Sequence, residues 1–296
     1  MKKGLIVVNA YCNLASMLNQ ANRLTEEFNK LGVEITVIKN GYSLYLNENG
    51  EIKGEDFNYD FCVYLDKDKY FATLLEKKGI RLFNKISSII NCDDKMLTNL
   101  ALVGSGVEIP ETFSSPLNYV NAEIQENELK QVASVLGFPL VVKLSFSSLG
   151  KGVYLVNNMK EFLKVVNDNK NQPKIYQKYI SSSFGTDVRI ICVGKIYLCA
   201  MQRKSETDFR SNAELGGKGY EYTPSDKFIK VAEKVAEILD LDYMGIDLLF
   251  GENNNPILCE VNSNAFFGVM EKTANVNVAK AYAEYVFKTI YNGDLL

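Results

Sequence analysis

The sequence of 296 residues contains no histidine. Without an imidazole the chain has neither a Ser-His nor a Cys-His nucleophile, and a zinc site is disfavoured because histidine is a common zinc ligand. Any chemistry must therefore use carboxylates, lysine, arginine, metal ions and phosphate groups.

Several other features are missing. No apolar run approaches the roughly 18 residues of a membrane span, and we expect no signal peptide before Gly4. With 33 Lys and Arg against 36 Asp and Glu, no overall basic charge attracts nucleic acid or an anionic membrane. The 6 cysteines form no Cys-x-x-Cys pair. We therefore expect reduced thiols in a cytoplasmic protein that binds neither nucleic acid nor a membrane.

The first 108 residues follow an α/β pattern. Gly4–Ala10 and Val33–Lys39 are predicted strands, and apolar residues at helical spacing fill the interval between them. Shorter strands are expected at 61–65 and 81–83, and Asn49-Gly50 predicts a hairpin turn. The turn after the first strand lacks Gly-x-Gly-x-x-Gly, so no dinucleotide site is expected there.

Beyond residue 108 the pattern becomes α+β. Strands are expected at 139–144, 153–156 and 174–180, with helices at 126–136 and 159–166. A division near residue 184 separates this part from a last region, 185–296. That region has two strands around Gly194, a polar loop at 205–219, a helix at 226–239, an acidic hairpin and a closing helix at 276–291.

The acidic hairpin spans 244–262. Two apolar runs flank six turn-forming residues, which is typical of a β-hairpin. If Phe250 pairs with Ile257, then Asp247 lies directly opposite Glu260. The Cβ atoms of opposite residues lie about 5 Å apart, so each carboxylate is expected to raise the pKa of the other unless a cation lies between them.

Side chains alternate along a strand, so Asn262 shares the face of Glu260, while Cys259 is expected to point the other way. Two carboxylates and one amide are oxygen ligands suited to a hard divalent cation. The alternative is a solvated hairpin face without metal. If the site is metal-binding, replacing Asp247 by Asn relieves repulsion, and the metal-free protein should melt no lower than the wild type.

The turn 145–152 joins two strands and is rich in Ser and Gly. It is not a P-loop, because no helix follows it, but its N–H groups can surround an anion. Lys143 on the entering strand lies between apolar residues, where a phosphate would supply the charge it needs. The alternatives are a plain mobile hairpin and a lysine whose ammonium reaches solvent.

Arginines gather near strand and loop ends in the last region, at Arg189, Arg203 and Arg210. A converging set of guanidinium groups indicates an anionic substrate, although each alone is consistent with a surface ion pair. The loop 205–219 is polar, and we expect it to be mobile and to close over a bound nucleotide.

Short motifs follow one another in a distinctive order through most of the chain. They are Asp94-Lys95, Phe138-Pro-Leu-Val-Val-Lys143, Gln177-Lys-Tyr-Ile180, Asp187-Val-Arg189, Gln202-Arg-Lys-Ser205, Phe209-Arg-Ser-Asn212, Gly216-Gly217, Gly245-Ile-Asp247, Glu260-Val-Asn262, Gly268-x-x-Glu271 and Thr273. This order resembles the ATP-grasp ligases, and within them the ribosomal-S6-modification and α-L-glutamate ligase (RimK-type) branch. The resemblance implies a pre-ATP-grasp α/β domain (1–108), an ATP-grasp N-terminal subdomain (109–184) and a C-terminal subdomain with the hairpin (185–296).

The resemblance also implies an ATP- and Mg²⁺-dependent carboxylate–amine ligase. Such an enzyme forms an amide through an acyl phosphate and releases ADP, here with an amino acid such as glutamate and a small-molecule or peptide carboxylate. Mn²⁺ is an alternative metal, and two ions are expected. Nucleotide contacts are implied for Lys95, Lys143, Ser147, Ser148, Gly150, Gly152, Gln177, Lys178, Tyr179, Ile180, Asp187, Arg210, Ser211 and Asn212. Metal ligands are implied at Asp247, Glu260 and Asn262, and catalytic roles at Arg203, Arg210 and Asn262.

Three departures from the branch pattern leave the substrates open. Lys178 stands where an acid is usual, Glu214 lies where a histidine normally precedes the Gly-Gly pair, and Ser263-Asn264 replaces the start of Ser-Pro-Gly. The alternatives are a ligase of another ATP-grasp branch, an ATP-grasp kinase and a nucleotide-binding regulatory module without turnover. Assembly as a homo-oligomer also stays open.

Overall fold

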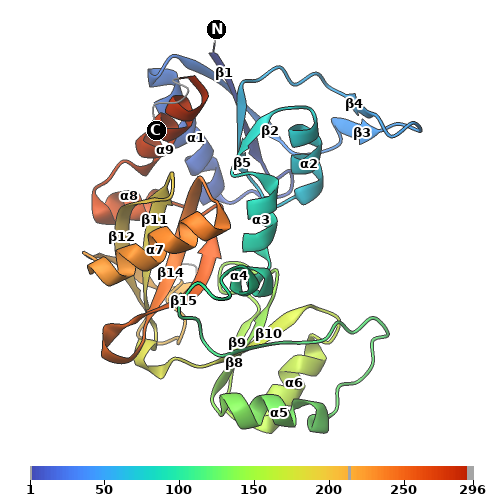
Figure 1. Ribbon diagram of the computed structural model, residues 1–296, viewed down its shortest axis with the longest axis vertical. Helices are drawn as coiled ribbons and strands as arrows, with labels where there is room; N and C mark the ends of the chain where they lie inside the picture. The colour runs from blue at the N-terminus through green and yellow to red at the C-terminus, as the bar shows by residue number, and fades with distance from the viewer. Residues whose placement is uncertain (1, 213–214, 292–296) are drawn as a thin grey trace.

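The computed structural model of the chain describes residues 2–212 and 215–291. Three main sheets follow one another along the long axis of the molecule, with the N-terminal sheet at one end and the sheet bearing α5 and α6 at the other (Figure 1). The strands of each sheet fall within one of the three segments expected from the sequence. The segment boundaries themselves stay a prediction.

The first sheet is parallel, with the order β2-β1-β5-β6. Its apolar strands β1 and β5 are buried, as expected of strands covered on both faces. A separate hairpin, β3–β4, projects from this unit (Figure 1). The elements are β1 (Lys2–Val8), α1 (Ala15–Lys30), β2 (Val33–Lys39), β3 (Leu44–Leu46), β4 (Ile52–Gly54), β5 (Phe61–Leu65), α2 (Lys69–Lys77), β6 (Arg81–Phe83), α3 (Ile86–Asp93) and α4 (Lys95–Ala101).

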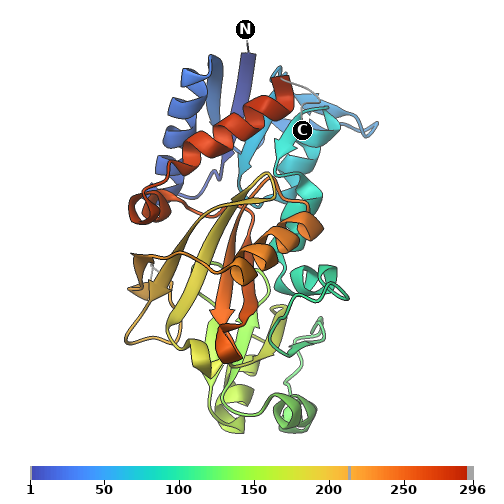
Figure 2. The same cartoon turned by 60° about the vertical axis from the view of Figure 1, so that its left-hand side comes forward.

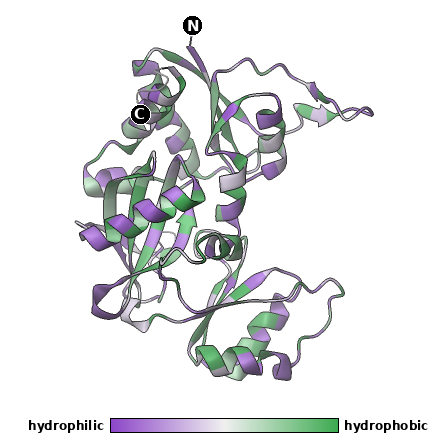
Figure 3. Ribbon diagram, viewed as in Figure 1, coloured by the Kyte–Doolittle hydropathy of each residue, from purple (hydrophilic) through white to green (hydrophobic). Residues whose placement is uncertain are grey.

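The middle sheet is antiparallel, with the order β7-β10-β8-β9. Helices α5 and α6 carry hydrophilic and hydrophobic residues along their length (Figure 3), and their apolar residues pack on one face of the sheet around Phe162. The elements are β7 (Thr112–Ser114), α5 (Glu126–Leu136), β8 (Leu140–Leu144), β9 (Val153–Val156), α6 (Met159–Asp168) and β10 (Lys174–Lys178).

The last sheet is antiparallel, with the order β13-β12-β11-β14-β15. One face packs against α7 and the other faces α8 and α9. The elements are β11 (Thr186–Val193), β12 (Ile196–Lys204), β13 (Lys218–Glu221), α7 (Asp226–Leu239), β14 (Tyr243–Phe250), β15 (Pro256–Asn262), α8 (Gly268–Ala274) and α9 (Val278–Tyr291), with single 3-10 turns at Ser181–Ser183 and Glu252–Asn254.

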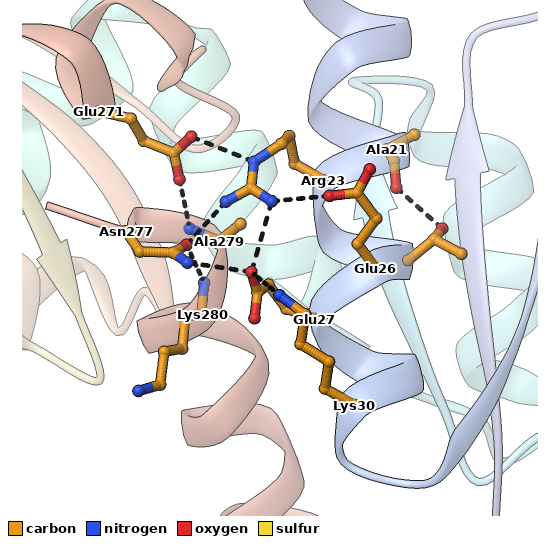
Figure 4. A network of polar contacts seen from close by, with 10 residues as sticks. Ala21, Arg23, Glu26, Glu27, Lys30, Glu271, Asn277, Ala279 and Lys280 are labelled. Carbon is orange, nitrogen blue, oxygen red and sulfur yellow. Dashed lines mark hydrogen bonds and ion pairs between the residues drawn. The ribbon is translucent and has the colours of Figure 1, made fainter.

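The C-terminal helix α9 returns to the first unit and lies across α1 (Figure 2). Tyr282 and Val286 of α9 share one buried cluster with Phe28 and Phe61. A polar network completes this contact (Figure 4): Arg23 bonds Glu271 at 3.4 Å and the side chain of Asn277 at 3.0 Å. The motif residue Glu271 is therefore a structural link between α1 and α8.

Asn84, directly after β6, joins the first unit to the last sheet. Its amide nitrogen donates to the carbonyls of Tyr243 and Ser263, both at 2.8 Å. Its amide oxygen accepts from the N–H groups of Asp242 at 2.6 Å and Tyr243 at 3.0 Å. One buried side chain thus satisfies four backbone groups of the hairpin region.

The hairpin register differs from the prediction. Phe250 pairs with Pro256 rather than Ile257, yet Asp247 still pairs with Glu260. Both hold because a β-bulge lies between Asp247 and Leu248, leaving one extra residue, Cys259, on β15. A sequence pattern with a strict period of two cannot show such an insertion.

Candidate active site

The first cavity, of about 100 Å³, lies between the middle sheet and the last sheet. We call it the nucleotide cavity. The residues with predicted nucleotide or metal roles that line it are Lys95, Lys143, Gly150, Gln177, Lys178, Tyr179, Ile180, Asp187, Arg210, Ser211, Asn212 and Glu260. Apolar lining residues that were assigned no role are Val141 and Phe209, which lie within the quoted motifs, and Leu249, which does not. The alternation of side chains along β8 predicts one of them, because Val141 lies on the same face of the strand as Lys143.

Lys143 is buried at the wall of this cavity. Its ammonium nitrogen lies 3.6 Å from the sulfur of Cys259, and no carboxylate pairs with it within residues 2–212 and 215–291. The side chain therefore does not extend to solvent, as one alternative supposed. A buried ammonium next to a cavity is suited to an anionic ligand.

Cys259 corrects a second expectation. It lines the nucleotide cavity together with Glu260 instead of pointing to the opposite face. The cause is the β-bulge, since an extra residue on β15 interrupts the alternation of side chains. Burial raises the pKa of this thiol, so Cys259 is a neutral wall of the cavity.

Asp247 is 2% exposed and is held by two arginines. Arg189 makes a two-point contact with its carboxylate, Nε to Oδ1 and Nη2 to Oδ2, each at 2.7 Å. Arg203 reaches Oδ2 at 2.8 Å and also pairs with Asp187. Burial alone would raise the pKa of Asp247, but the two guanidinium groups outweigh it and lower the pKa to about 2.

The expectation that Asp247 and Glu260 raise each other's pKa is therefore wrong for Asp247. The two residues are opposite, as predicted, but Arg189 and Arg203 supply the positive charge that the sequence assigned to a cation. Arg189 belonged to the motif pattern and was not among the assigned site residues. Arg189 and Asp247 are paired across β11 and β14, and the order of motifs along the chain could not predict this pairing.

Glu260 is more exposed than Asp247, with 27% of its side chain accessible to solvent. Its nearest cation is Lys95, whose ammonium lies 3.3 Å from Oε1 and also donates to the carbonyl of Ser147 at 2.7 Å. Asn262, two residues further along β15, has a buried amide nitrogen without a hydrogen-bond partner in the described part of the chain. Glu260 and Asn262 thus present unused polar groups beside a cavity.

The donor set fits a magnesium ion. Mg²⁺ is usually held by one or two carboxylates together with water and phosphate oxygens. Glu260 supplies an accessible carboxylate, and Asn262 lines the substrate cavity beside it. Asp247 lines neither cavity, and both its oxygens accept hydrogen bonds from arginine, Oδ1 from Arg189 alone in the described structure. No cluster of three or more Asp, Glu or Cys side chains suited to a metal occurs within residues 2–212 and 215–291, so water and phosphate would complete the shell.

The turn 145–152 contacts both neighbouring units. Arg210, held by Asp208 at 2.8 and 2.9 Å, donates to the carbonyls of Gly150 at 2.8 Å and Val153 at 3.2 Å. Gly150 has φ +72°, and a Cβ there would meet the side chain of Leu215 at 2.7 Å. The loop that bears Arg210 therefore rests on the turn. Glu214 and its neighbour 213 lie outside the described residues.

Three residues assigned to the nucleotide lie elsewhere in the turn. The hydroxyl of Ser147 donates to the carbonyl of Leu144 at 2.9 Å. The hydroxyl of Ser148 accepts from the ammonium of Lys67 at 3.1 Å. Gly152 borders a different surface hollow, on the outer side of β9. None of these three lines the nucleotide cavity.

The second cavity, of about 510 Å³, lies between the first unit and β15. We call it the substrate cavity. Arg203 and Asn262, both with predicted catalytic roles, line it, and Glu260 lines both cavities. Polar lining residues that were assigned no site role are Asn9, Ser16, Asn19, Asp66, Lys67 and Asn264, of which only Asn264 was noted, as a departure from the branch pattern. Asn9, Asp66, Lys67 and Asn264 follow the separate strands β1, β5 and β15, and Ser16 and Asn19 lie on α1, so no local motif joins these residues and only the fold brings them together.

Among the described residues no helix combines the length and the apolar character needed to cross a membrane.

Comparison with known proteins gives the chain's relationships. It is 36% identical over 238 residues to human (Homo sapiens) beta-citrylglutamate synthase B, covering 79% of this chain and 60% of that protein. It is 34% identical over 233 residues to human N-acetylaspartylglutamate synthase A, covering 78% and 58%. The chain thus spans about three fifths of the length of these relatives.

Solved structures agree on the fold. The D-alanine–D-alanine ligase of Bacillus anthracis complexed with ATP has a TM-score of 0.75 at 18% identity, over 99% of this chain and 98% of that one. The ATP-grasp ligase PsnB complexed with minimal precursor, Mg and ADP has a TM-score of 0.69 at 16% identity, over 97% of each chain.

The predicted ATP-grasp fold, an α/β unit followed by two α+β parts, is therefore confirmed. Residues 92–286 match the RimK-like ATP-grasp domain family. That range contains the hairpin and all the residues that line the nucleotide cavity. The chain belongs to the RimK-like ATP-grasp family.

Proposed function

We propose that the chain is an ATP- and Mg²⁺-dependent carboxylate–amine ligase. In this reaction the carboxylate of one substrate attacks the γ-phosphate of ATP, an amine then displaces phosphate from the acyl phosphate, and an amide, ADP and phosphate result. An amino acid such as glutamate is the amine substrate, which is supported by the glutamate in the names of both human relatives.

The observation that carries this proposal is the position of Glu260. It lines the nucleotide cavity and the substrate cavity at once. A phosphate at the end of a nucleotide and a carboxylate from the substrate side would therefore meet at the same side chain. Phosphoryl transfer needs such alignment and charge neutralisation more than it needs a general base.

The chain's own residues supply the positive charge. Lys143 and Lys95 line the nucleotide cavity, and Arg203 lines the substrate cavity beside Glu260. Cations placed beforehand stabilise the charge that develops on the phosphate oxygens during transfer. Asp247, Glu260 and Asn262 would hold Mg²⁺ (or Mn²⁺, with two ions expected), which neutralises phosphate charge when bound.

Water must be kept from the acyl phosphate, since hydrolysis would waste ATP. Arg210 joins the loop 205–212 to the turn 145–152, which covers one side of the nucleotide cavity. We expect this loop to close further over ATP. The predicted roles of Ser147, Ser148 and Gly152 then concern the covering turn rather than the cavity wall.

The test is a product analysis. The full chain is incubated with Mg-ATP, pairs of a carboxylate and an amino acid, and the nucleotides and product masses are measured. ADP, phosphate and a condensed amide are expected. AMP and pyrophosphate would exclude the acyl-phosphate route, and a phosphorylated product without amine would indicate a kinase.

The remaining assignments belong to the same proposal. The pre-ATP-grasp domain covers 1–108 and the two ATP-grasp subdomains cover 109–184 and 185–296. Cytoplasmic residence is supported by the six free thiols at Cys12, Cys62, Cys92, Cys192, Cys199 and Cys259. Assembly as a homo-oligomer stays a prediction, which light scattering of the purified chain tests.

A further inference from the structure

Asp66 lies where the strand order of the first sheet reverses. The chain passes from β1 to β2 on one side of β1, and β5 lies on the other side. In open α/β sheets, ligands bind outside the carboxyl ends of the strands at such a reversal. Asp66 directly follows β5 and Asn9 directly follows β1, so both stand at that position.

The carboxylate of Asp66 is held by neutral donors. The side-chain amide of Asn9 donates to both its oxygens, at 3.1 and 3.2 Å, and the N–H of Lys67 donates at 2.7 Å. The side chain of Asn40 supplies a further hydrogen bond. No ammonium or guanidinium pairs with Asp66 in the described ranges, because the ammonium of Lys67 turns to Asp93 at 2.7 Å.

Asp66 therefore carries a negative charge that its surroundings do not balance. The residue is only 8% exposed, and buried carboxylates are almost always paired with a cation. Burial raises the pKa of Asp66, which is the expected result of that missing partner. The charge is nonetheless reachable, since Asp66 lines the substrate cavity.

The opposite wall of the substrate cavity is formed by β15 and the residues after it. Glu260, Asn262 and Asn264 stand at alternate positions and all line the cavity. The side chain of Asn264 makes no hydrogen bond within the described chain, and its buried amide oxygen lacks a partner. Asn264 is also a departure from the branch pattern, so it is a feature of this chain's own substrate cavity.

We propose that the substrate cavity binds the amino-acid substrate, with Asp66 receiving its protonated amino group and accepting the proton that this group gives up before it attacks the acyl phosphate, and with Asn264 receiving a further polar group. The inference rests on the proposed ligase function and names the part of the molecule that selects the amine substrate. Asp66 is thus a specificity-determining residue of the first unit.

A purely structural role for Asp66 makes a different prediction. The same hydrogen bonds hold the ends of β1 and β2 together, so a structural residue would affect stability without distinguishing ligands. Recognition of an ammonium group instead requires that a ligand lose affinity when its amino group is removed. L-glutamate and glutarate differ only in that group, and they are therefore the probes.

The experiment is calorimetric titration of the full chain in the presence of Mg-ADP. L-glutamate and glutarate are titrated first, followed by the other amino acids and the des-amino analogue of the one that binds most tightly. We expect the wild type to prefer the amino acid by roughly tenfold or more, as for a buried charge-assisted contact. Asp66→Asn should reduce that preference to within about threefold and leave the affinity for Mg-ADP unchanged. Asp68→Asn is the matched control, because Asp68 caps α2 and does not line the cavity.

Equal affinity of the wild type for an amino acid and its des-amino analogue would overturn the proposal, as would the absence of any amino-acid binding. Retention of the preference by Asp66→Asn would overturn it too. If that variant does not fold, the wild-type comparison still decides. Failure of Mg-ADP to bind would instead contradict the ligase proposal, so the two failures are distinguishable.

Discussion

The nucleotide cavity and the substrate cavity meet at Glu260 but are built differently. The nucleotide cavity is smaller, about 100 Å³ against 510 Å³, and most of its walls are strands and turns from residues 141–187 and 209–212. The substrate cavity joins segments around residues 9–19, 65–67 and 260–269. The nucleotide cavity is thus lined mostly by short runs of neighbouring residues, whereas the substrate cavity is lined by side chains that are far apart in the sequence.

Glu260→Gln should have the largest effect, because this residue lines both cavities. If Glu260 holds Mg²⁺ as we propose, its loss should lower kcat/KM by roughly a thousandfold, about 4 kcal/mol. Glu260 is partly exposed, and Lys95 is its one ion-pair partner within residues 2–212 and 215–291, so the melting temperature without nucleotide should change little. Steady-state kinetics measure the loss of kcat/KM, and thermal melting measures the change in stability. A kcat/KM within tenfold of the wild type would contradict a role for Glu260 at the meeting point of the two cavities.

Asp247→Asn, unlike Glu260→Gln, should lower the stability of the protein without nucleotide. The substitution leaves Arg189 without its partner and removes one of two carboxylates from Arg203. We expect a loss of about 3 kcal/mol in the free energy of unfolding, which replaces the sequence-based expectation of unchanged or higher stability. Chemical denaturation of both proteins without nucleotide measures it.

The pH dependence sharpens this prediction. The folded-state pKa of Asp247 is about 2, below the value of roughly 3.9 for an unfolded Asp. Its ion pairs therefore stabilise the fold fully above about pH 4 and are lost as the pH falls toward 2. The stability difference between wild type and Asp247→Asn should shrink over that interval, and a difference constant down to pH 3 would contradict the assignment.

Lys143→Met should affect the nucleotide cavity alone. Removal of a charge-assisted phosphate contact should weaken Mg-ATP binding by roughly 10- to 100-fold, or 1.5–3 kcal/mol. Amino-acid binding in the substrate cavity should stay within about threefold of the wild type. Calorimetry with each ligand tests the separation, and Lys151→Met, an exposed lysine of the adjacent turn, is the control.

Arg210→Ala should have the smallest effect on stability. Its ion pair with Asp208 is partly exposed, so we expect a change of about 1 kcal/mol or less. The amides of the loop 205–212 should exchange faster with solvent, and a non-hydrolysable ATP analogue should restore less protection than in the wild type. Hydrogen exchange followed by mass spectrometry measures both, and equal protection with and without the analogue in the wild type would exclude loop closure.

The two cavities also differ in how far the sequence could predict them. The ends of β8 and β10 carry Lys143 and Gln177 within short runs, and those motifs indicated the nucleotide cavity before any geometry was known. Asp66 stands alone after a buried strand, and nothing near it in the sequence separates it from a surface acid. Its role depends on the reversal of strand order, which is a property of the sheet.

Within the hairpin, the pairing of Asp247 with Glu260 was predictable and the partners of Asp247 were not. The β-bulge at Cys259 follows from hydrogen bonding of two strands, which no period-two pattern contains. The two arginines lie on β11 and β12, so their convergence on one carboxylate requires the order of the last sheet. The short elements β7, β13 and α8 were also missed, since three to seven residues are too few for a periodic pattern.

The four hydrogen bonds of Asn84 bear on how the chain can be divided for expression. The region that matches the family begins at residue 92, yet the backbone groups of Tyr243 and Ser263 find their partner at residue 84. A fragment starting at residue 92 would leave these groups unpaired and expose the face of α9 that packs on α1. We therefore expect the RimK-like region to be less stable without the first 91 residues, which belong in any recombinant version of it.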